Sequence, residues 1–207
     1  LYLLRSVMTE PESVPVEAHP PGIELSFQAY QFEGQSLERP FDVAFDGDDR
    51  IYVPVTEQKM IAVFDQQGEN GRVFVQDQQE SGLPLSDYQL VAPLGIDVDD
   101  EGKVYVADLK KMAVVVFSPA GEMLQELSVM APRCVEVEGG RVYVLTAQGV
   151  LVVMDTQGNV LGQWGEYGRG PNQMSDPNGL IVDDDGNIYI CDMDNYRVIC
   201  LDRDLEL

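Results

Sequence analysis

Apolar and polar residues alternate in four similar stretches of the chain. Each stretch begins with a proline and a short alternating run, passes through a turn rich in Asp, Asn and Gly, and continues with a tyrosine between aliphatic residues. The stretches start at Pro40, Pro93, Pro132 and Pro177, and their tyrosines are Tyr52, Tyr105, Tyr143 and Tyr189. Alternation with a period of two around such turns predicts antiparallel β-hairpins.

Further apolar runs follow each hairpin. A third run is present in all four stretches, and the first three add a fourth run at residues 72–75, 123–127 and 160–164. A repeat of about forty residues with four antiparallel strands is typical of a β-propeller blade. We therefore predict an all-β fold, a β-propeller of four-stranded antiparallel blades. Four blades are expected near residues 37–76, 90–127, 130–164 and 174–207.

The fourth stretch resembles an NHL repeat. The motif is carried by PNGLIVD from Pro177, DGNIYICD from Asp185 and NYRV from Asn195. The second stretch matches the first two strands of the repeat over residues 93–108, whereas the first and third are weaker copies, and all of the first three lack the Asn-x-Arg-Val signature. The resemblance covers roughly residues 23–207 and implies an NHL-type propeller. Such propellers include both binding modules and enzymes, so the fold does not decide the activity.

The number of blades has two interpretations. The alternating stretch at residues 23–32 precedes the first blade and is expected to supply the outer strand that the last blade lacks. That strand would close a four-bladed ring, or a six-bladed ring of which this sequence holds four blades. Closure matters because exposed sheet edges invite unwanted pairing. Since NHL-like propellers usually have six blades, we favour an incomplete six-bladed ring.

Residues 1–22 differ from the repeats. Residues 1–5 are an apolar stub, and residues 6–22 form a Pro-rich, acidic linker. Two interpretations of the stub stay open, the end of a membrane anchor and an ordinary chain terminus. We expect the anchor, through a segment before Leu1. It would display the propeller at the periplasmic or extracellular face of a membrane.

The charge pattern bears on the kind of partner. The chain has 36 acidic and 13 basic residues and a net charge of −23, which would repel phosphate backbones and disfavours nucleic acid as a partner. Threaded onto blades, the acidic residues gather in the turns of one face and more than half of the bases on the opposite face. Two interpretations of these bases stay open. They are ordinary solvated loop residues, or they form a surface that binds an acidic partner.

The interpretation as a surface for an acidic partner yields candidate partner-binding residues. Trp164 and Tyr167 flank the long connection before the last blade, where exposed aromatic side chains could anchor a protein, although Trp164 could also simply cover its own blade. The predicted partner-binding residues are Lys59, Lys110, Lys111, Arg133, Trp164, Tyr167, Arg169 and Arg197. We predict a non-catalytic interaction module that docks on a protein, such as a membrane complex or an extracellular protein.

The sequence shows no clear set of residues for a catalytic site. Propeller enzymes of the lyase type rely on several histidines, but this chain has one, His19, in the linker, so no zinc site and no cofactor are predicted. Asp183, Asp185 and Asn187 alternate like calcium ligands, but the position of Gly186 favours a hairpin turn. The alternative function is a periplasmic lactonase or lyase with carboxylates and a divalent metal in the central channel.

The three cysteines are expected to be buried free thiols. Cys134 begins an innermost strand and is expected to face the channel. Cys191 and Cys200 lie on neighbouring strands of the last blade, and a bridge between them in an oxidising compartment stays open. The four repeated tyrosines are expected to pack between blades.

Overall fold

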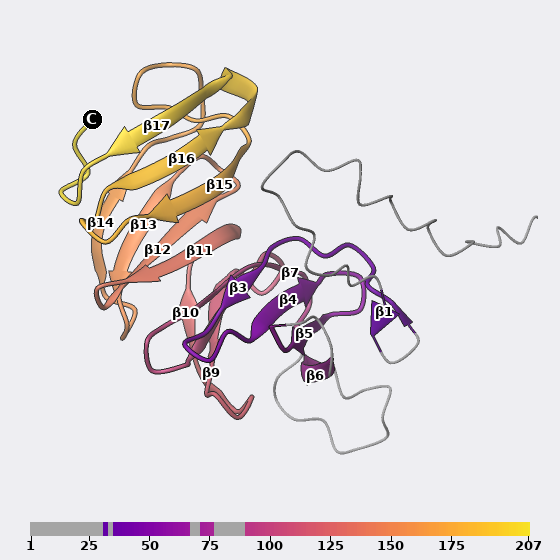
Figure 1. Cartoon of the computed structure of the whole chain (residues 1–207). Helices are drawn as coiled ribbons and strands as arrows, with labels where there is room; N and C mark the ends of the chain where they lie inside the picture. The colour runs from indigo at the N-terminus through magenta and orange to yellow at the C-terminus, as the bar shows by residue number, and fades with distance from the viewer. Residues whose placement is uncertain (1–30, 33–34, 67–70, 77–89) are drawn as a thin grey trace, which may run out of the picture.

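The computed structural model describes residues 31–32, 35–66, 71–76 and 90–207. The described chain is almost entirely β-structure and forms four antiparallel sheets in sequence order, together with a small hairpin of β1 (Gln31–Phe32) and β2 (Gln35–Ser36) (Figure 1). The predicted all-β fold with antiparallel blades is therefore confirmed.

Each sheet is built from consecutive strands. The first sheet contains β3 (Ala44–Phe45), β4 (Ile51–Val55), β5 (Met60–Phe64) and β6 (Arg72–Gln76). The second contains β7 (Pro93–Val98), β8 (Val104–Asp108), β9 (Ala113–Phe117) and β10 (Met123–Ser128). The third contains β11 (Pro132–Glu138), β12 (Arg141–Thr146), β13 (Leu151–Asp155) and β14 (Val160–Trp164). The described part of the fourth contains β15 (Pro177–Val182), β16 (Ile188–Asp192), the short 3-10 helix η3 (Met193–Asn195) and β17 (Arg197–Leu201).

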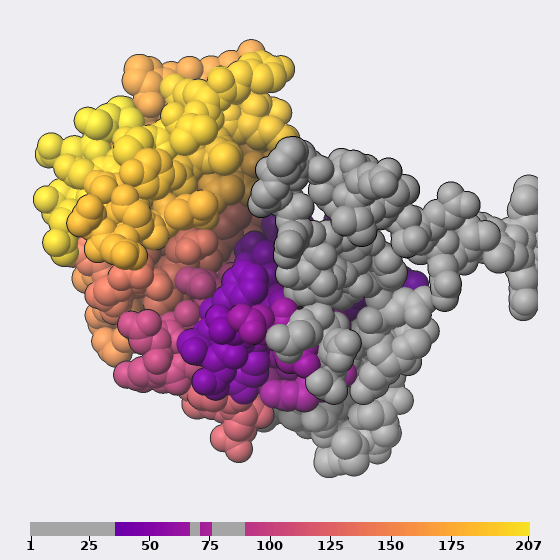
Figure 2. Space-filling view, in the orientation of Figure 1, coloured from indigo at the N-terminus to yellow at the C-terminus, as the bar shows by residue number. Residues whose placement is uncertain are grey.

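Successive sheets pack face to face, and the first strands of neighbouring sheets lie side by side, β3 beside β7, β7 beside β11 and β11 beside β15. In the space-filling view the sheets follow one another from indigo to yellow (Figure 2). The first strands therefore form the inner edge of the arrangement, as in a propeller.

Three apolar cores hold the sheets together, one between each neighbouring pair. In the first core the rings of Tyr52 and Phe74 meet edge to face with centroids 5.2 Å apart, and Phe74 meets Phe117 in the same way at 6.5 Å. Burial of each large apolar side chain contributes about 1.5–3 kcal/mol. Tyr52, Tyr105 and Tyr143 are buried between sheets as predicted, but Tyr189 is partly exposed.

The acidic hairpin turns have a common internal structure. In the turn between β7 and β8, Asp99 Oδ1 accepts the backbone N–H groups of Glu101 at 3.0 Å and Lys103 at 2.8 Å. The hydroxyl of Tyr105 donates to the other oxygen of Asp99 at 3.2 Å, and Gly102 takes a φ of 77°. Asp46 and Asp183 make the same bonds in their turns, with Tyr52 and Tyr189 as hydroxyl donors. These carboxylates hold the backbone of tight turns, which supports the turn interpretation of Asp183 and Gly186.

Several predicted features lie outside the described residues. Residues 1–22, His19 among them, and residues 23–30 of the expected closing strand are in this group, and Gln31–Phe32 pair with β2 rather than with β17. Among the residues that the structure describes, no helix has the length and apolar character to cross a bilayer.

Candidate functional site

A buried carboxylate organises the end of β16. Asp192 is fully buried and accepts the backbone N–H of Ser175 at 2.7 Å, the side-chain amide of Asn195 at 2.9 Å and Arg197 Nε at 2.8 Å. Burial alone would raise the pKa of Asp192, but these hydrogen bonds and the Arg197 charge outweigh it and hold the pKa below its usual range. Asp108, at the same place in β8, is also buried and accepts the N–H groups of Val91, Ala92, Lys110 and Lys111.

The Asp192 network fixes the long connection between β14 and β15. Arg197 Nη2 donates to the carbonyl oxygen of Gly170 at 2.9 Å and to that of Gln173, and the Asn195 amide donates to the carbonyl oxygen of Gly168 at 2.9 Å. Without these hydrogen bonds, a connection of twelve residues would lose conformational entropy when a partner ordered it. The network therefore holds residues 165–176 in one shape against the turn after β16.

Large side chains project from this fixed region into solvent. Tyr167 is 70% exposed and Tyr196 95% exposed, and Met193 and Arg169 are exposed beside them in sequence. Tyr196 has a left-handed backbone, with φ 55° and ψ 41°, which is uncommon for a bulky residue. We call Tyr167, Arg169, Met193 and Tyr196 the aromatic turn surface. Tyr and Arg are enriched in protein-binding hot spots, and adaptable Met side chains are common at binding surfaces.

The structure separates the predicted partner-binding residues into two groups. Lys59, Lys110, Tyr167 and Arg169 are exposed. The other four make contacts within the molecule. Lys111 pairs with Glu126 at 3.0 Å, and Trp164 packs against the third core. Arg133 binds Asp176 and the carbonyl oxygen of Pro177, and so joins the third sheet to the fourth, while Arg197 is part of the Asp192 network.

Only part of the predicted set comes together. Tyr167 and Arg169 lie in the connection that Arg197 holds through the carbonyl oxygen of Gly170. Lys59, Lys110 and Lys111 lie in the turns of the first and second sheets that are equivalent to the turn before Arg197. Sequence reasoning missed Met193 and Tyr196. The turn position of Tyr196 gives no signal of its own in the sequence, since Lys59, Met112 and Gly149 hold the equivalent positions of the other sheets and all four have positive φ.

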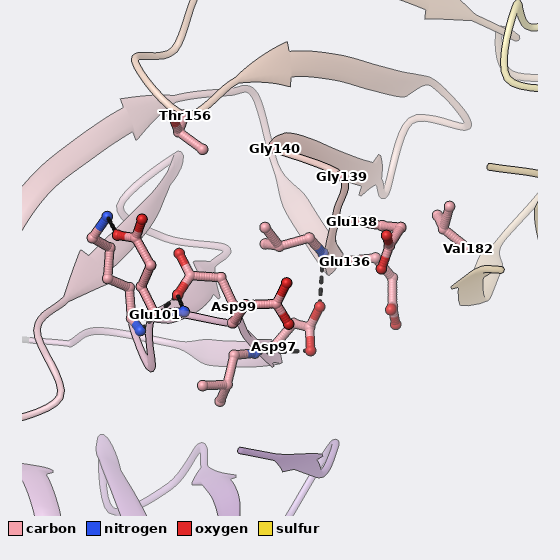
Figure 3. A pocket seen from close by; sticks show the side chains of 13 residues that line it. Asp97, Asp99, Glu101, Glu136, Glu138, Gly139, Gly140, Thr156 and Val182 are labelled. Carbon is pink, nitrogen blue, oxygen red and sulfur yellow. Dashed lines mark hydrogen bonds and ion pairs between the residues drawn. The ribbon is translucent and has the colours of Figure 1, made fainter. Parts of the chain in front are cut away.

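A second candidate lies at the inner edge of the sheets. A cavity of about 460 Å³ is lined mainly by acidic side chains of the second and third sheets, Asp97, Asp99, Glu101, Glu136 and Glu138 among them (Figure 3). Burial raises the pKa of Asp97 to about 6, although the N–H groups of Val137 and Val98 act against it. Burial, helped by the charges of Asp97 and Asp42, raises the pKa of Glu136 to about 8. These carboxylates are missed by motif searches, but an acid within an apolar alternation, as in IDV and VEV, could have pointed to them.

The inner carboxylates are poor metal ligands in this arrangement. Asp42 accepts the N–H groups of Val43 and Ile96, one on each oxygen, and Asp97 accepts those of Val98 and Val137 in the same way. Across the described ranges no group of three or more His, Cys, Asp or Glu side chains is arranged to hold a metal ion. In the described part of the chain these carboxylates therefore do not fit the divalent metal that a lactonase-type site would need.

The expectation of buried thiols is correct for Cys134 and wrong for Cys191 and Cys200, which are exposed. The two exposed thiols are free. Cys191 is paired across the strands with Val198 and Cys200 with Tyr189, so the two cysteines are not directly opposite each other.

Comparison with solved structures supports the propeller fold. Streptogramin B lyase aligns with a TM-score of 0.62 at 13% sequence identity, over 81% of this chain and 52% of the lyase chain. A catalytically inactive variant of virginiamycin B lyase from Staphylococcus aureus, with quinupristin, aligns with a TM-score of 0.62 at 12% identity, over 81% of this chain and 53% of the other. Kuenenia stuttgartiensis hydrazine synthase aligns with a TM-score of 0.54 at 15% identity, over 82% and 51%. The fold is a β-propeller, and the chain spans about half the length of these structures.

A chain of the mitotic checkpoint complex also aligns, with a TM-score of 0.59 at 11% identity, over 80% of this chain and 47% of that chain. The similar folds thus include a lyase and a member of a protein complex. No protein-family model matches the sequence, and no curated protein sequence matches it.

Proposed function

We propose that this chain is a non-catalytic interaction module, a β-propeller that binds a protein partner through the aromatic turn surface. The observation that carries the proposal is the combination of exposure and rigidity there. Tyr167 and Tyr196 project into solvent, while the buried Asp192 network fixes the backbone on both sides of them. A surface held in its binding shape loses little entropy when it meets a partner.

Charge supports the choice of this side of the molecule. The turns opposite to it carry Asp46, Asp99, Asp155, Asp183 and Asp202 with further acids beside them. The side of the aromatic turn surface holds the exposed bases Lys59, Lys110 and Arg169. With a net charge of −23, the molecule would approach an acidic or neutral protein surface with this side, since the opposite side is repelled.

The proposal includes two finer points. We infer an NHL-type propeller from the fourth repeat, and a place at the outer face of a membrane from the apolar character of residues 1–5 and the linker that follows. The partner would then be a membrane complex or an extracellular protein.

The test is affinity enrichment from solubilised native membranes with quantitative mass spectrometry. The bait is the chain itself or its Tyr167→Ala/Tyr196→Ala variant. We expect one set of proteins to be enriched by the unchanged chain and at least about tenfold less by the variant, which corresponds to a loss of about 1.4 kcal/mol of binding free energy. An Arg169→Glu variant should lose the same proteins.

The matched control is Leu124→Ala, an exposed apolar residue on β10 away from this surface. The control should enrich the same proteins as the unchanged chain. Equal recovery by the double tyrosine variant, or an enrichment that falls with Leu124→Ala to the same extent, would contradict the proposed surface.

A further inference from the structure

A groove of about 310 Å³ lies between the second and third sheets, beside the end of β10. On the side of the second sheet its lining includes Val129 and Met130, and on the side of the third sheet Val150, Val152 and Val160. None of the described residues that line the groove is charged, although charged residues make up 24% of the chain. The groove therefore suits an apolar group and not an ion.

The groove has a buried floor and an open mouth. Val129 and Val152 belong to the apolar core between the second and third sheets. At the mouth, Met130 is 68% and Val160 56% exposed. A small molecule in so open a groove would keep much of its surface in water, whereas small-molecule pockets usually bury most of their ligand. A protein segment that inserts one side chain would cover the mouth with its own backbone.

The groove adjoins the connection that carries part of the aromatic turn surface. Gln148, in the turn between β12 and β13, lines the groove. A Cβ atom at the next residue, Gly149, would lie 2.7 Å from the carbonyl oxygen of Met174 and 3.3 Å from that of Glu166. The same turn therefore contacts both the groove and residues 165–176, so a bound segment can continue from one to the other.

The two segments next to the groove each carry an exposed base. Lys110 is in the turn between β8 and β9, and this turn adjoins the groove because the carbonyl oxygen of its Met112 accepts the Val129 N–H at 3.1 Å. Arg169 is the exposed base of residues 165–176. The local charge beside this uncharged groove is therefore complementary to carboxylates that flank an apolar side chain.

We propose that the groove receives an apolar side chain from an acidic segment of the protein partner that binds the aromatic turn surface. The inference rests on the proposed function, because the same partner occupies both places. The inserted side chain would lie between Met130 and Val160, and the acidic residues beside it would meet Lys110 and Arg169. The groove would thus decide which segments bind, since a segment needs both the apolar side chain and the acids next to it.

The test uses random peptides displayed on phage as the probe, selected on the purified chain. We expect a consensus with one large apolar residue and Asp or Glu beside it. A synthetic consensus peptide should bind Val160→Asp at least about tenfold more weakly than the unchanged chain, because the new carboxylate would be desolvated by the inserted side chain.

The matched control is Leu161→Asp. Leu161 follows Val160 on β14 and is 55% exposed, but it lines a separate hollow with Arg203 and Leu205. This variant should bind the peptide as the unchanged chain does. Lys110→Glu should also weaken binding, whereas Lys59→Glu, in the equivalent turn of the first sheet, should not.

Three results would overturn the proposal. The first is a selection that yields no peptide whose binding depends on Val160, and the second is a consensus without an apolar residue or without acids. The third is a dimer of the unchanged chain that Val160→Asp dissociates in sedimentation analysis, because a second copy would then be the occupant.

Affinity enrichment from solubilised native membranes separates this inference from the proposed function. Val160→Asp should lose the same proteins as Tyr167→Ala/Tyr196→Ala, and Leu161→Asp should retain them. Proteins that the double tyrosine variant loses but Val160→Asp retains would overturn the role of the groove and leave the proposed function in place. Proteins that only Val160→Asp loses would contradict the aromatic turn surface and support the groove as a separate site.

Discussion

Asp97 Oδ2 accepts the backbone N–H of Val137 at 2.7 Å, so one carboxylate joins the innermost strands of the second and third sheets. Asp42 makes the same connection to Ile96, between the first and second sheets, at 3.1 Å. Glu136 occupies the position of Asp97 in the third sheet, since both are paired with the repeated tyrosine of the next strand. Besides burial, the charge of Asp42 raises the pKa of Asp97, and the charges of Asp97 and Asp42 raise the pKa of Glu136.

Stability should fall as pH rises from the usual carboxyl pKa to about 8 because of Glu136. Its pKa is about 8 in the folded chain, above the usual carboxyl value, so the folded state binds more protons than the unfolded state between those two values. The stabilisation is fully present below the usual carboxyl pKa and is lost as pH rises through about 8.

Urea unfolding at pH 6.5 and pH 8.5 tests this effect. Glu136→Gln should reduce the loss of unfolding free energy between these pH values by at least about 1 kcal/mol, the equivalent of roughly one pKa unit. Glu138→Gln, in the same cavity, is the matched control and should leave the pH dependence as it is. An unchanged pH dependence in Glu136→Gln would show that Glu136 is ionised in the folded chain at pH 6.5.

Asp192→Ala should be strongly destabilising and should also loosen residues 165–176. The change leaves the Arg197 guanidinium without its carboxylate and the Ser175 N–H without its acceptor. We expect a loss of about 3–5 kcal/mol in unfolding free energy, together with faster hydrogen exchange at Ser175. Asp184→Ala, an exposed turn residue, should change neither quantity. Fast exchange at Ser175 in the unchanged chain would argue against a fixed connection.

Gly95→Ala should destabilise the contact between β7 and β11. A Cβ atom at Gly95 would lie 2.7 Å from the carbonyl oxygen of Arg133 and 2.7 Å from the Cα atom of Cys134, both backbone atoms that cannot move independently. Overpacking of this kind costs about 1–3 kcal/mol, measurable by urea unfolding. The control is Gly47→Ala, where an added Cβ has no neighbour within 4 Å. Equal stability of both variants would mean that the innermost strands can separate freely.

The three cysteines should differ in reactivity. Cys191 and Cys200 are exposed and free, so each should react with a thiol reagent in the purified, folded chain. Burial raises the pKa of Cys134 to about 12, so it should react only after unfolding. Titration with Ellman's reagent should give two fast equivalents and a third in denaturant. A single fast equivalent would indicate that one of the two exposed thiols is covered.

The repeated elements of the fold were predictable from the sequence, but the roles of single side chains were less so. Alternation around Tyr52, Tyr105 and Tyr143 was enough to place strands and buried faces, because each strand carries its own pattern. Tyr189 has the same pattern but is partly exposed. Its burial depends on a neighbouring sheet, which a local pattern cannot show.

The basic residues show a second limit of sequence reasoning. Arg133 and Arg197 lie at the beginnings of β11 and β17, and their sequence context predicts a place on a binding surface. In the structure they donate to Pro177, Gly170 and Gln173, which are at least twenty-four residues away in the chain. Tertiary hydrogen bonds of this kind produce no periodic pattern in a sequence. The exposure of Lys59 and Lys110, in contrast, follows from their positions in turns, which the sequence does predict.

The succession of sheets also has a consequence for unfolding. Each sheet packs on the sheets next to it in the chain, so stability is a sum of terms between neighbours, as in other repeat proteins. In the described chain the first and the fourth sheets each pack on a single neighbouring sheet, and in the fourth sheet β17 is an edge strand with an uncovered face beside it. The described chain would therefore open first at its first or its fourth sheet, while the second and third sheets, each held between two neighbours, would be the last to lose their structure.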